Sequence, residues 1–113
     1  KVGADIEKIK DYNSDIPKRF FSKNEVLYIE NQKTYEEKKK AFFSLWTLKE
    51  STAKLYGTPL IDALKKYEII PDGNFFIKNN VFYSLHYTDG FIITVASQSG
   101  YFEKLDSVSL IQH

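Results

Sequence analysis

The feature that most constrains the fold is a long helical pattern between residues 34 and 57. TYEE (34–37) matches a capping box, and neither glycine nor proline follows it until Gly57, with Pro59 shortly after. A capping box satisfies backbone N–H groups in a first helical turn, and a glycine permits the left-handed turn that ends a helix. The apolar run FFSLWTLKESTAK (42–54) then predicts a helix that buries much of its circumference.

Shorter elements flank this helix on both sides. VGADIEKI (2–9) predicts a strand, and SKNE (22–25) matches another capping box, which would open a helix running to about Asn31. PLIDALKKY (59–67) predicts one or two further helical turns.

The last part of the chain has the composition of β-strands. The predicted strands are YEII, NFFIKN, VFYSLHY, FIITVAS and a short SVSLI at 107–111, with turns at PDGN and TDG. No internal repeat or linker divides the chain. The sequence therefore predicts a single α+β domain over residues 1–113, in which an antiparallel sheet packs against the long helix.

Charge and cysteine content exclude several classes of protein. A net charge of +1 argues against nucleic-acid binding, which needs a strongly basic face. The absence of cysteine excludes disulfides and thiolate metal sites. No apolar run reaches the length of a membrane span and no signal peptide opens the chain, so we expect a cytoplasmic protein. The chain has no methionine and begins inside a predicted strand, which suggests a piece of a longer protein.

Three carboxylates are predicted to meet where the first strand crosses the long helix. Asp5 and Glu7 are two residues apart on the strand, so their side chains point to the same face. At about 100° per residue, Glu50 lies about 40° from Trp46 and about 20° from Phe43 around the helix. An acid on this aromatic face is costly to bury unless something pairs with it. We therefore expect the helix to pack across the strand and to bring Glu50 to the other two acids.

The predicted acidic cluster offers only oxygen ligands and has lysines beside it. Such a set suits Mg²⁺, which keeps several waters and often takes substrate phosphate as a further ligand. Lys54 stands one helical turn after Glu50, and Lys49 directly precedes it. Carboxylates for a metal and lysines for phosphate are what phosphoryl transfer requires. Spacing alone leaves open a plainer reading, in which the acids are a solvated strand edge and Glu50–Lys54 is a surface pair worth about 0.3 kcal/mol.

Three blocks of sequence together resemble the 4′-phosphopantetheinyl transferase superfamily. They are VGADIEKI, RFFSKNE and FFSLWTLKESTAKLYG, and they cover about residues 2 to 57. The family pattern is Gly-x-Asp (often then x-Glu), Arg-x-Phe-Ser/Thr-x-x-Glu, and Trp-Ser/Thr-x-Lys-Glu-Ser/Ala-x-x-Lys. The form with Trp46 resembles the larger, surfactin-synthetase-activating type, which is a pseudo-dimer of two similar halves in one chain. The resemblance implies that this sequence is the C-terminal half.

The resemblance also implies a reaction and roles for individual residues. A phosphopantetheinyl transferase moves the phosphopantetheine arm of coenzyme A to a serine hydroxyl of an acyl or peptidyl carrier protein and releases adenosine 3′,5′-bisphosphate. Asp5, Glu7 and Glu50 would hold Mg²⁺, and Glu50 would also take the serine proton. Lys54 would neutralise charge on the phosphate. Lys49 is a second candidate for that task.

The family's basic residues for the nucleotide belong to the N-terminal half, so that half is an expected partner. Alone, this half would be inactive, and an exposed apolar face would favour its self-association into a homodimer. The alternatives are a small homotrimeric holo-acyl-carrier-protein synthase and a non-catalytic α+β binding or scaffold module. We expect Trp46 to pack so that it fixes the helix against the strand. Phe20 and Phe21 should pack in the core, and His86 should be an ordinary sheet residue.

Overall fold

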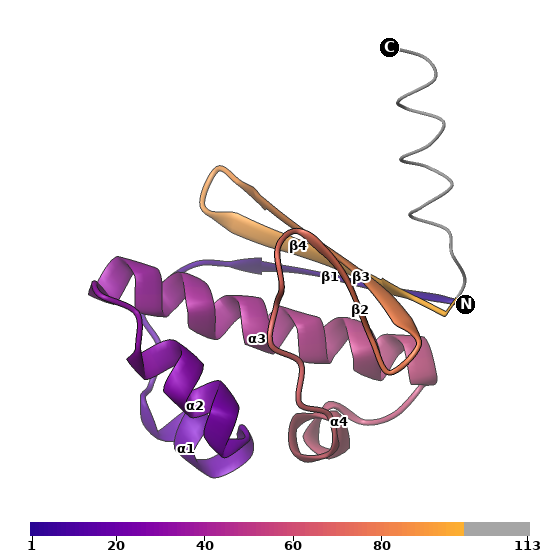
Figure 1. Ribbon diagram of the computed structural model, residues 1–113, viewed down its shortest axis with the longest axis horizontal. Coiled ribbons are helices and arrows are strands. Elements are labelled where there is room, and N and C mark those ends of the chain that lie inside the picture. Colours follow the sequence, from indigo (N-terminus) through magenta and orange to yellow (C-terminus); the bar gives the residue numbers. More distant parts are fainter. Residues whose placement is uncertain (99–113) are drawn as a thin grey trace.

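A computed structural model describes residues 1–98 of the chain. Its elements, in chain order, are β1 (Val2–Lys8), α1 (Asp15–Phe20), α2 (Lys23–Glu30), α3 (Tyr35–Tyr56), α4 (Leu60–Lys66), β2 (Phe75–Lys78), β3 (Val81–Thr88) and β4 (Phe91–Ser97). They form three layers, in which α3 lies between the sheet and the short helices α1, α2 and α4 (Figure 1). The predicted α+β class, with a sheet against a long helix, is confirmed. The strand predicted at 107–111 lies outside the described residues.

The four strands form one antiparallel sheet in the order β1-β4-β3-β2. Two-residue turns join the later strands, at Asn79–Asn80 (φ 52° and 63°) and at Asp89–Gly90 (φ 48° and 78°). Positive φ at both turn residues matches the natural twist of a hairpin, and Asn, Asp and Gly adopt it most readily. The last described strand, β4, also pairs with the first, β1. Among the described strands, β1 is therefore an edge strand.

The long helix α3 begins and ends as its sequence predicts. The Thr34 hydroxyl accepts a hydrogen bond from the Glu37 backbone N–H at 3.1 Å. At the other end Gly57 has a φ of 66°, and the Thr58 N–H donates to the carbonyl of Ala53 at 2.9 Å. Both interactions satisfy backbone groups that a helix terminus leaves unpaired. No helix within residues 1–98, α3 included, is apolar over enough length to cross a membrane.

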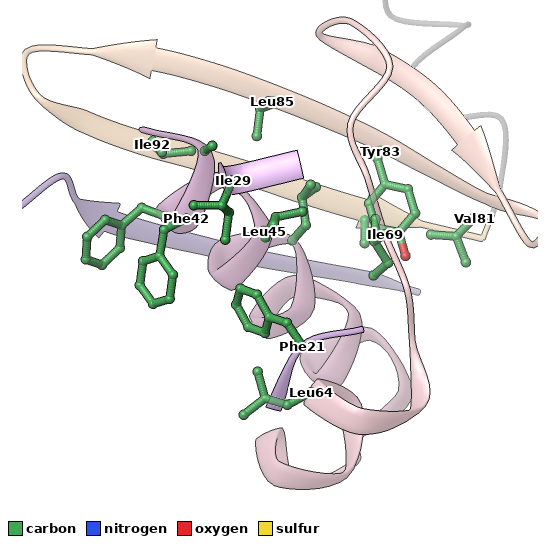
Figure 2. Packing of buried hydrophobic residues seen from close by; sticks show 14 of the residues in the cluster. Phe21, Ile29, Phe42, Leu45, Leu64, Ile69, Val81, Tyr83, Leu85 and Ile92 are labelled. Atoms are coloured by element: carbon green, nitrogen blue, oxygen red, sulfur yellow. The ribbon is translucent and has the colours of Figure 1, made fainter. Parts of the chain in front are cut away.

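The hydrophobic core lies on both sides of α3. Leu45 and Leu48 are completely buried, because β1 and β4 cover one side of the helix and α2 and α4 the other. In Figure 2, Phe42 and Leu45 lie between sheet residues such as Ile92 and the helical-layer residue Phe21. The Phe21 ring is stacked on Phe42 with centroids 5.6 Å apart, as its predicted core position requires.

Gly3 lets α3 approach β1 at backbone distance. A Cβ atom placed on Gly3 would lie 2.1 Å from the carbonyl oxygen of Ser51 and 2.5 Å from the backbone nitrogen of Leu55. Both are backbone atoms that cannot rotate away, so no larger residue fits without moving the helix. The next inward position on the strand is Asp5. The close contact at Gly3 therefore sets how near the helix side chains come to that carboxylate.

Two sequence expectations were incorrect or incomplete. YEII (67–70) is not a strand. Its Ile69 is buried, and the Ile69 N–H donates to the Glu25 carboxylate at 2.9 Å, so a side chain takes the place of a strand partner. The six-residue helix α1 was not predicted, and its N-cap residue Ser14 makes no side-chain capping bond that could have marked it.

Candidate functional site

β1 runs along α3 (Figure 1). The three predicted carboxylates lie on these two elements, near enough to affect one another's pKa. Asp5 is buried on the face of β1 that meets the helix, and Glu7 is half-buried on the same face. Glu50 is half-buried on the facing side of α3 and interacts electrostatically with Asp5 and with Glu7. We call Asp5, Glu7 and Glu50 the acidic cluster.

Both carboxylate oxygens of Asp5 have a partner on α3. The Lys54 ammonium lies 3.0 Å from Oδ1, and the Thr47 hydroxyl donates to Oδ2 at 2.5 Å. Thr47 is completely buried, whereas about half of the Lys54 side chain is exposed. One oxygen is therefore held by a fixed buried group and the other by a lysine that can turn toward solvent.

The remaining two acids are shifted toward their protonated forms. Burial, and next the Asp5 carboxylate, raise the pKa of Glu7 from its ordinary 4.5 to about 7. Burial and Asp5 also raise the pKa of Glu50, an effect that Lys54 partly offsets. The pKa of Lys54 is raised by its hydrogen bond to Asp5. With all three acids ionised, the acidic cluster would carry more negative charge than Lys54 neutralises, so an additional cation would stabilise its ionised form.

Two open hollows each border one member of the acidic cluster. Glu7 and Trp46 line one of them, together with Lys10, Tyr12 and other residues of the segment after β1. The second is lined by Asp5 and Lys54, with Ala4, Ile6 and Ile93. A ligand can therefore reach the carboxylates from solvent. Trp46 is half-buried and stacks on Phe42 of the same helix, and it also lines the first hollow.

Lys49 does not lie at the acidic cluster. Its side chain is completely buried on another side of α3, with Nζ 2.9 Å from the Glu25 carboxylate and bonded to the carbonyls of Leu64 and Tyr67. Burial lowers the pKa of Lys49, and the Glu25 carboxylate opposes this shift. The prediction that Lys49 meets phosphate is corrected on this point, because a lysine enclosed by three protein acceptors has no surface to offer a ligand.

The donor chemistry of the acidic cluster fits a hard divalent cation. Its protein ligands would be carboxylate oxygens, which Mg²⁺ prefers. Burial, and next the Asp5 carboxylate, raise the pKa values of Glu7 and Glu50, so the ionised acids lack a sufficient partner. As they stand, no three His, Cys, Asp or Glu side chains in residues 1–98 are arranged to hold a metal ion. Lys54 occupies Oδ1 of Asp5, so ligation through that oxygen would require the lysine to move.

Thr47 is a residue of this site that the sequence did not single out. The available signal was its spacing, because it lies three residues before Glu50 and seven before Lys54 and so shares their helix face. What spacing could not show is the partner of its hydroxyl, which is Asp5 on a different element.

Comparison with known proteins points to one family. The model of the 4′-phosphopantetheinyl transferase superfamily matches residues 1–96. The 4′-phosphopantetheinyl transferase gsp of Aneurinibacillus migulanus is 35% identical over 79 residues, which are 70% of this chain and 30% of that protein. The transferase ffp of Bacillus subtilis is 35% identical over 102 residues (88% and 43%), and Sfp of Bacillus subtilis strain 168 is 38% identical over 68 residues (60% and 30%). The chain spans less than half the length of these curated relatives.

Proposed function

The chain belongs to the 4′-phosphopantetheinyl transferase superfamily, and we propose that the protein carrying it transfers the 4′-phosphopantetheine arm of coenzyme A to a serine of an acyl or peptidyl carrier protein. The observation that supports this most strongly is the acidic cluster with Lys54 beside it, at the contact of β1 with α3. It combines carboxylates suited to Mg²⁺ with a cation suited to phosphate.

Asp5, Glu7 and Glu50 would hold the magnesium ion in this proposal. When bound, Mg²⁺ supplies positive charge to the pyrophosphate oxygens of coenzyme A. Asp5 would provide its Oδ1, since Oδ2 is already fixed by the buried Thr47 hydroxyl. Glu7 and Glu50 would contribute from the strand and the helix. Burial and the Asp5 carboxylate raise the pKa of each, and a bound cation would oppose that shift and favour loss of their protons.

The transfer breaks one phosphorus–oxygen bond and forms another. The carrier serine oxygen attacks the phosphorus that bears pantetheine, and adenosine 3′,5′-bisphosphate leaves with the bonding electrons. Glu50 takes the serine proton, directly or through a water. Its raised pKa suits this role, because a base works best when its pKa lies nearer the working pH.

Lys54 would stabilise the charge that builds up on the leaving phosphate. Its side chain is half exposed and on the same helix face as Glu50, so it can turn from Asp5 toward a bound ligand. A cation placed where negative charge develops lowers the barrier of the step. Lys10, which lies beside Glu7 in the first hollow, is a second cation at the entrance.

Coenzyme A binding would require more than the described residues. Apart from Lys54 and Lys10, the residues of the chain that line the two hollows are acidic, polar or apolar. The matched relatives are more than twice as long as the matched segment, so we propose that groups outside this chain grip the nucleotide. In a homodimer of the chain, the second copy would take the place of those outside groups.

The proposed transfer can be tested by the mass of a carrier protein. The protein carrying this chain is incubated with coenzyme A, Mg²⁺ and an apo carrier protein. The carrier should gain the mass of one phosphopantetheine arm, and a carrier whose acceptor serine is replaced by alanine should not. A non-catalytic binding module would leave the mass unchanged under every condition.

A further inference from the structure

Buried hydroxyl groups on α3 differ in the acceptor to which they donate a hydrogen bond. The Ser44 hydroxyl donates to the Lys40 carbonyl at 2.6 Å, and the Thr52 hydroxyl donates to the Leu48 carbonyl at 2.7 Å. This bond to the preceding turn is the usual partner of a serine or threonine inside a helix. The Thr47 hydroxyl instead donates to the Asp5 carboxylate, on another element.

The helix backbone at Thr47 is bonded to the sheet. Asp5 on β1 is directly opposite Thr94 on β4, and the Thr94 hydroxyl donates to the Thr47 carbonyl at 2.9 Å. Ser51, one turn later on the helix, bonds to the Thr94 carbonyl at 3.2 Å. Thr47, Ser51 and Thr94 are all completely buried. The donor that meets Asp5 is therefore part of a rigid frame shared by three elements.

Fixing one oxygen of a carboxylate determines where the other one points. With Oδ2 bonded to Thr47, the Oδ1 of Asp5 faces the side on which Lys54 lies. We infer that Thr47 is a positioning residue, which orients the Asp5 carboxylate so that Oδ1 is presented to a divalent cation in the acidic cluster. This inference rests on the proposed function, because it assigns Thr47 a role toward the proposed metal.

Loss of such an outer hydrogen bond has a known order of effect. Groups that bond to a metal ligand without touching the metal typically change metal affinity by about 10–100-fold when removed. A structural role alone would lower the free energy of unfolding and leave the affinity for the metal as it was. Metal affinity therefore separates the two roles.

The test measures Mn²⁺ binding to this chain by electron paramagnetic resonance, in which only free Mn²⁺ gives a sharp signal. Thr47→Val removes the hydroxyl and keeps the size of the side chain, and Thr47→Ser keeps the hydroxyl. Thr52→Val is the matched control, since it also removes a buried, bonded hydroxyl from α3. Circular dichroism checks that each variant is folded.

We expect Thr47→Val to raise the Mn²⁺ dissociation constant at least tenfold, Thr47→Ser to stay within about threefold of the wild type, and Thr52→Val to match the wild type. Folded Thr47→Val that binds Mn²⁺ as the wild type does would overturn the inference and leave the proposed function standing. Equal weakening by Thr52→Val would also overturn it. If Glu50→Gln does not weaken Mn²⁺ binding, the proposed metal site itself is wrong and the role of Thr47 falls with it.

Discussion

The Nζ atom of Lys54 lies 3.0 Å from Oδ1 of Asp5, so a helix lysine serves as counter-ion to a strand carboxylate. Asp5 is buried, and a buried carboxylate without a partner is costly. In the proposed reaction Asp5 would help to hold Mg²⁺, which would leave Lys54 free to meet phosphate. Lys54 would then have two roles, pairing with the buried Asp5 carboxylate when no metal is bound and stabilising phosphate charge during transfer.

Replacing Lys54 by alanine should slow transfer by tenfold or more, because the cation near the leaving phosphate is lost. The measurement is the rate of carrier modification at saturating coenzyme A. Lys38→Ala is the control, since Lys38 lies at the other end of α3, about 24 Å away along the helix axis. Equal loss of rate in both variants would contradict the placement of Lys54 at the site.

Replacing Gly3 by alanine should destabilise the chain by about 1–3 kcal/mol or more, since the new Cβ would collide with the backbone of α3 at Ser51 and Leu55. Urea unfolding of the wild type and the variant gives the difference. Ala4→Ser, on the exposed face of β1, should change the free energy of unfolding by about 0.5 kcal/mol at most. A Gly3→Ala chain as stable as the wild type would show that α3 does not lie this close to β1.

Lys49→Met should act on stability and not on phosphate. It would leave the completely buried Glu25 without its cation, which typically costs about 3–5 kcal/mol. The double variant Lys49→Met/Glu25→Leu should recover part of that loss, because no unpaired charge remains. Urea unfolding of both variants measures this. A Lys49→Met chain that unfolds like the wild type but binds coenzyme A more weakly would reinstate Lys49 as a phosphate ligand.

The stability of the metal-free chain should depend on pH through Glu7. Its pKa is about 7 in the folded state and 4.5 ordinarily, so between these values the folded chain binds more protons than the unfolded chain. The free energy of unfolding should therefore fall as pH rises from about 4.5 to about 7. Glu7→Gln removes this contribution. The free energy of unfolding of the variant, relative to that of the wild type, should therefore be higher at pH 8 than at pH 4. Urea unfolding with a chelator present measures it, and identical pH profiles for the two chains would contradict the shifted pKa.

Local patterns were sufficient to predict most of the fold. The long helix was predictable because Thr34 and Gly57 mark its ends, and β1, β3 and β4 because their sequences are apolar or β-branched between clear turns. The strand predicted at YEII was wrong because its β-branched residues are typical of strands, while the backbone N–H of Ile69 is bonded to a carboxylate 44 positions earlier in the chain. Only the folded arrangement reveals such a long-range partner.

The candidate site was predictable to the extent that spacing determines direction. Alternation on β1 and helical periodicity on α3 correctly placed Asp5, Glu7 and Glu50 on facing surfaces. Lys49 was misplaced because it was assigned to the site for its position next to Glu50 in the sequence. Consecutive helix residues lie about 100° apart around the axis, and on that side α2 and α4 cover Lys49. Helical spacing gives the direction of a side chain, but not the element that packs against it.

The most direct test of the acidic cluster as a transferase site is the rate of carrier modification by Glu50→Gln. The substitution keeps the shape of the side chain and removes both its charge for metal ligation and its capacity as a base. With circular dichroism showing an intact fold, we expect the rate of coenzyme A-dependent carrier modification to fall at least about 100-fold. Near-normal turnover by a folded Glu50→Gln protein would contradict the role of Glu50 and, with it, the assignment of this cluster as the catalytic centre.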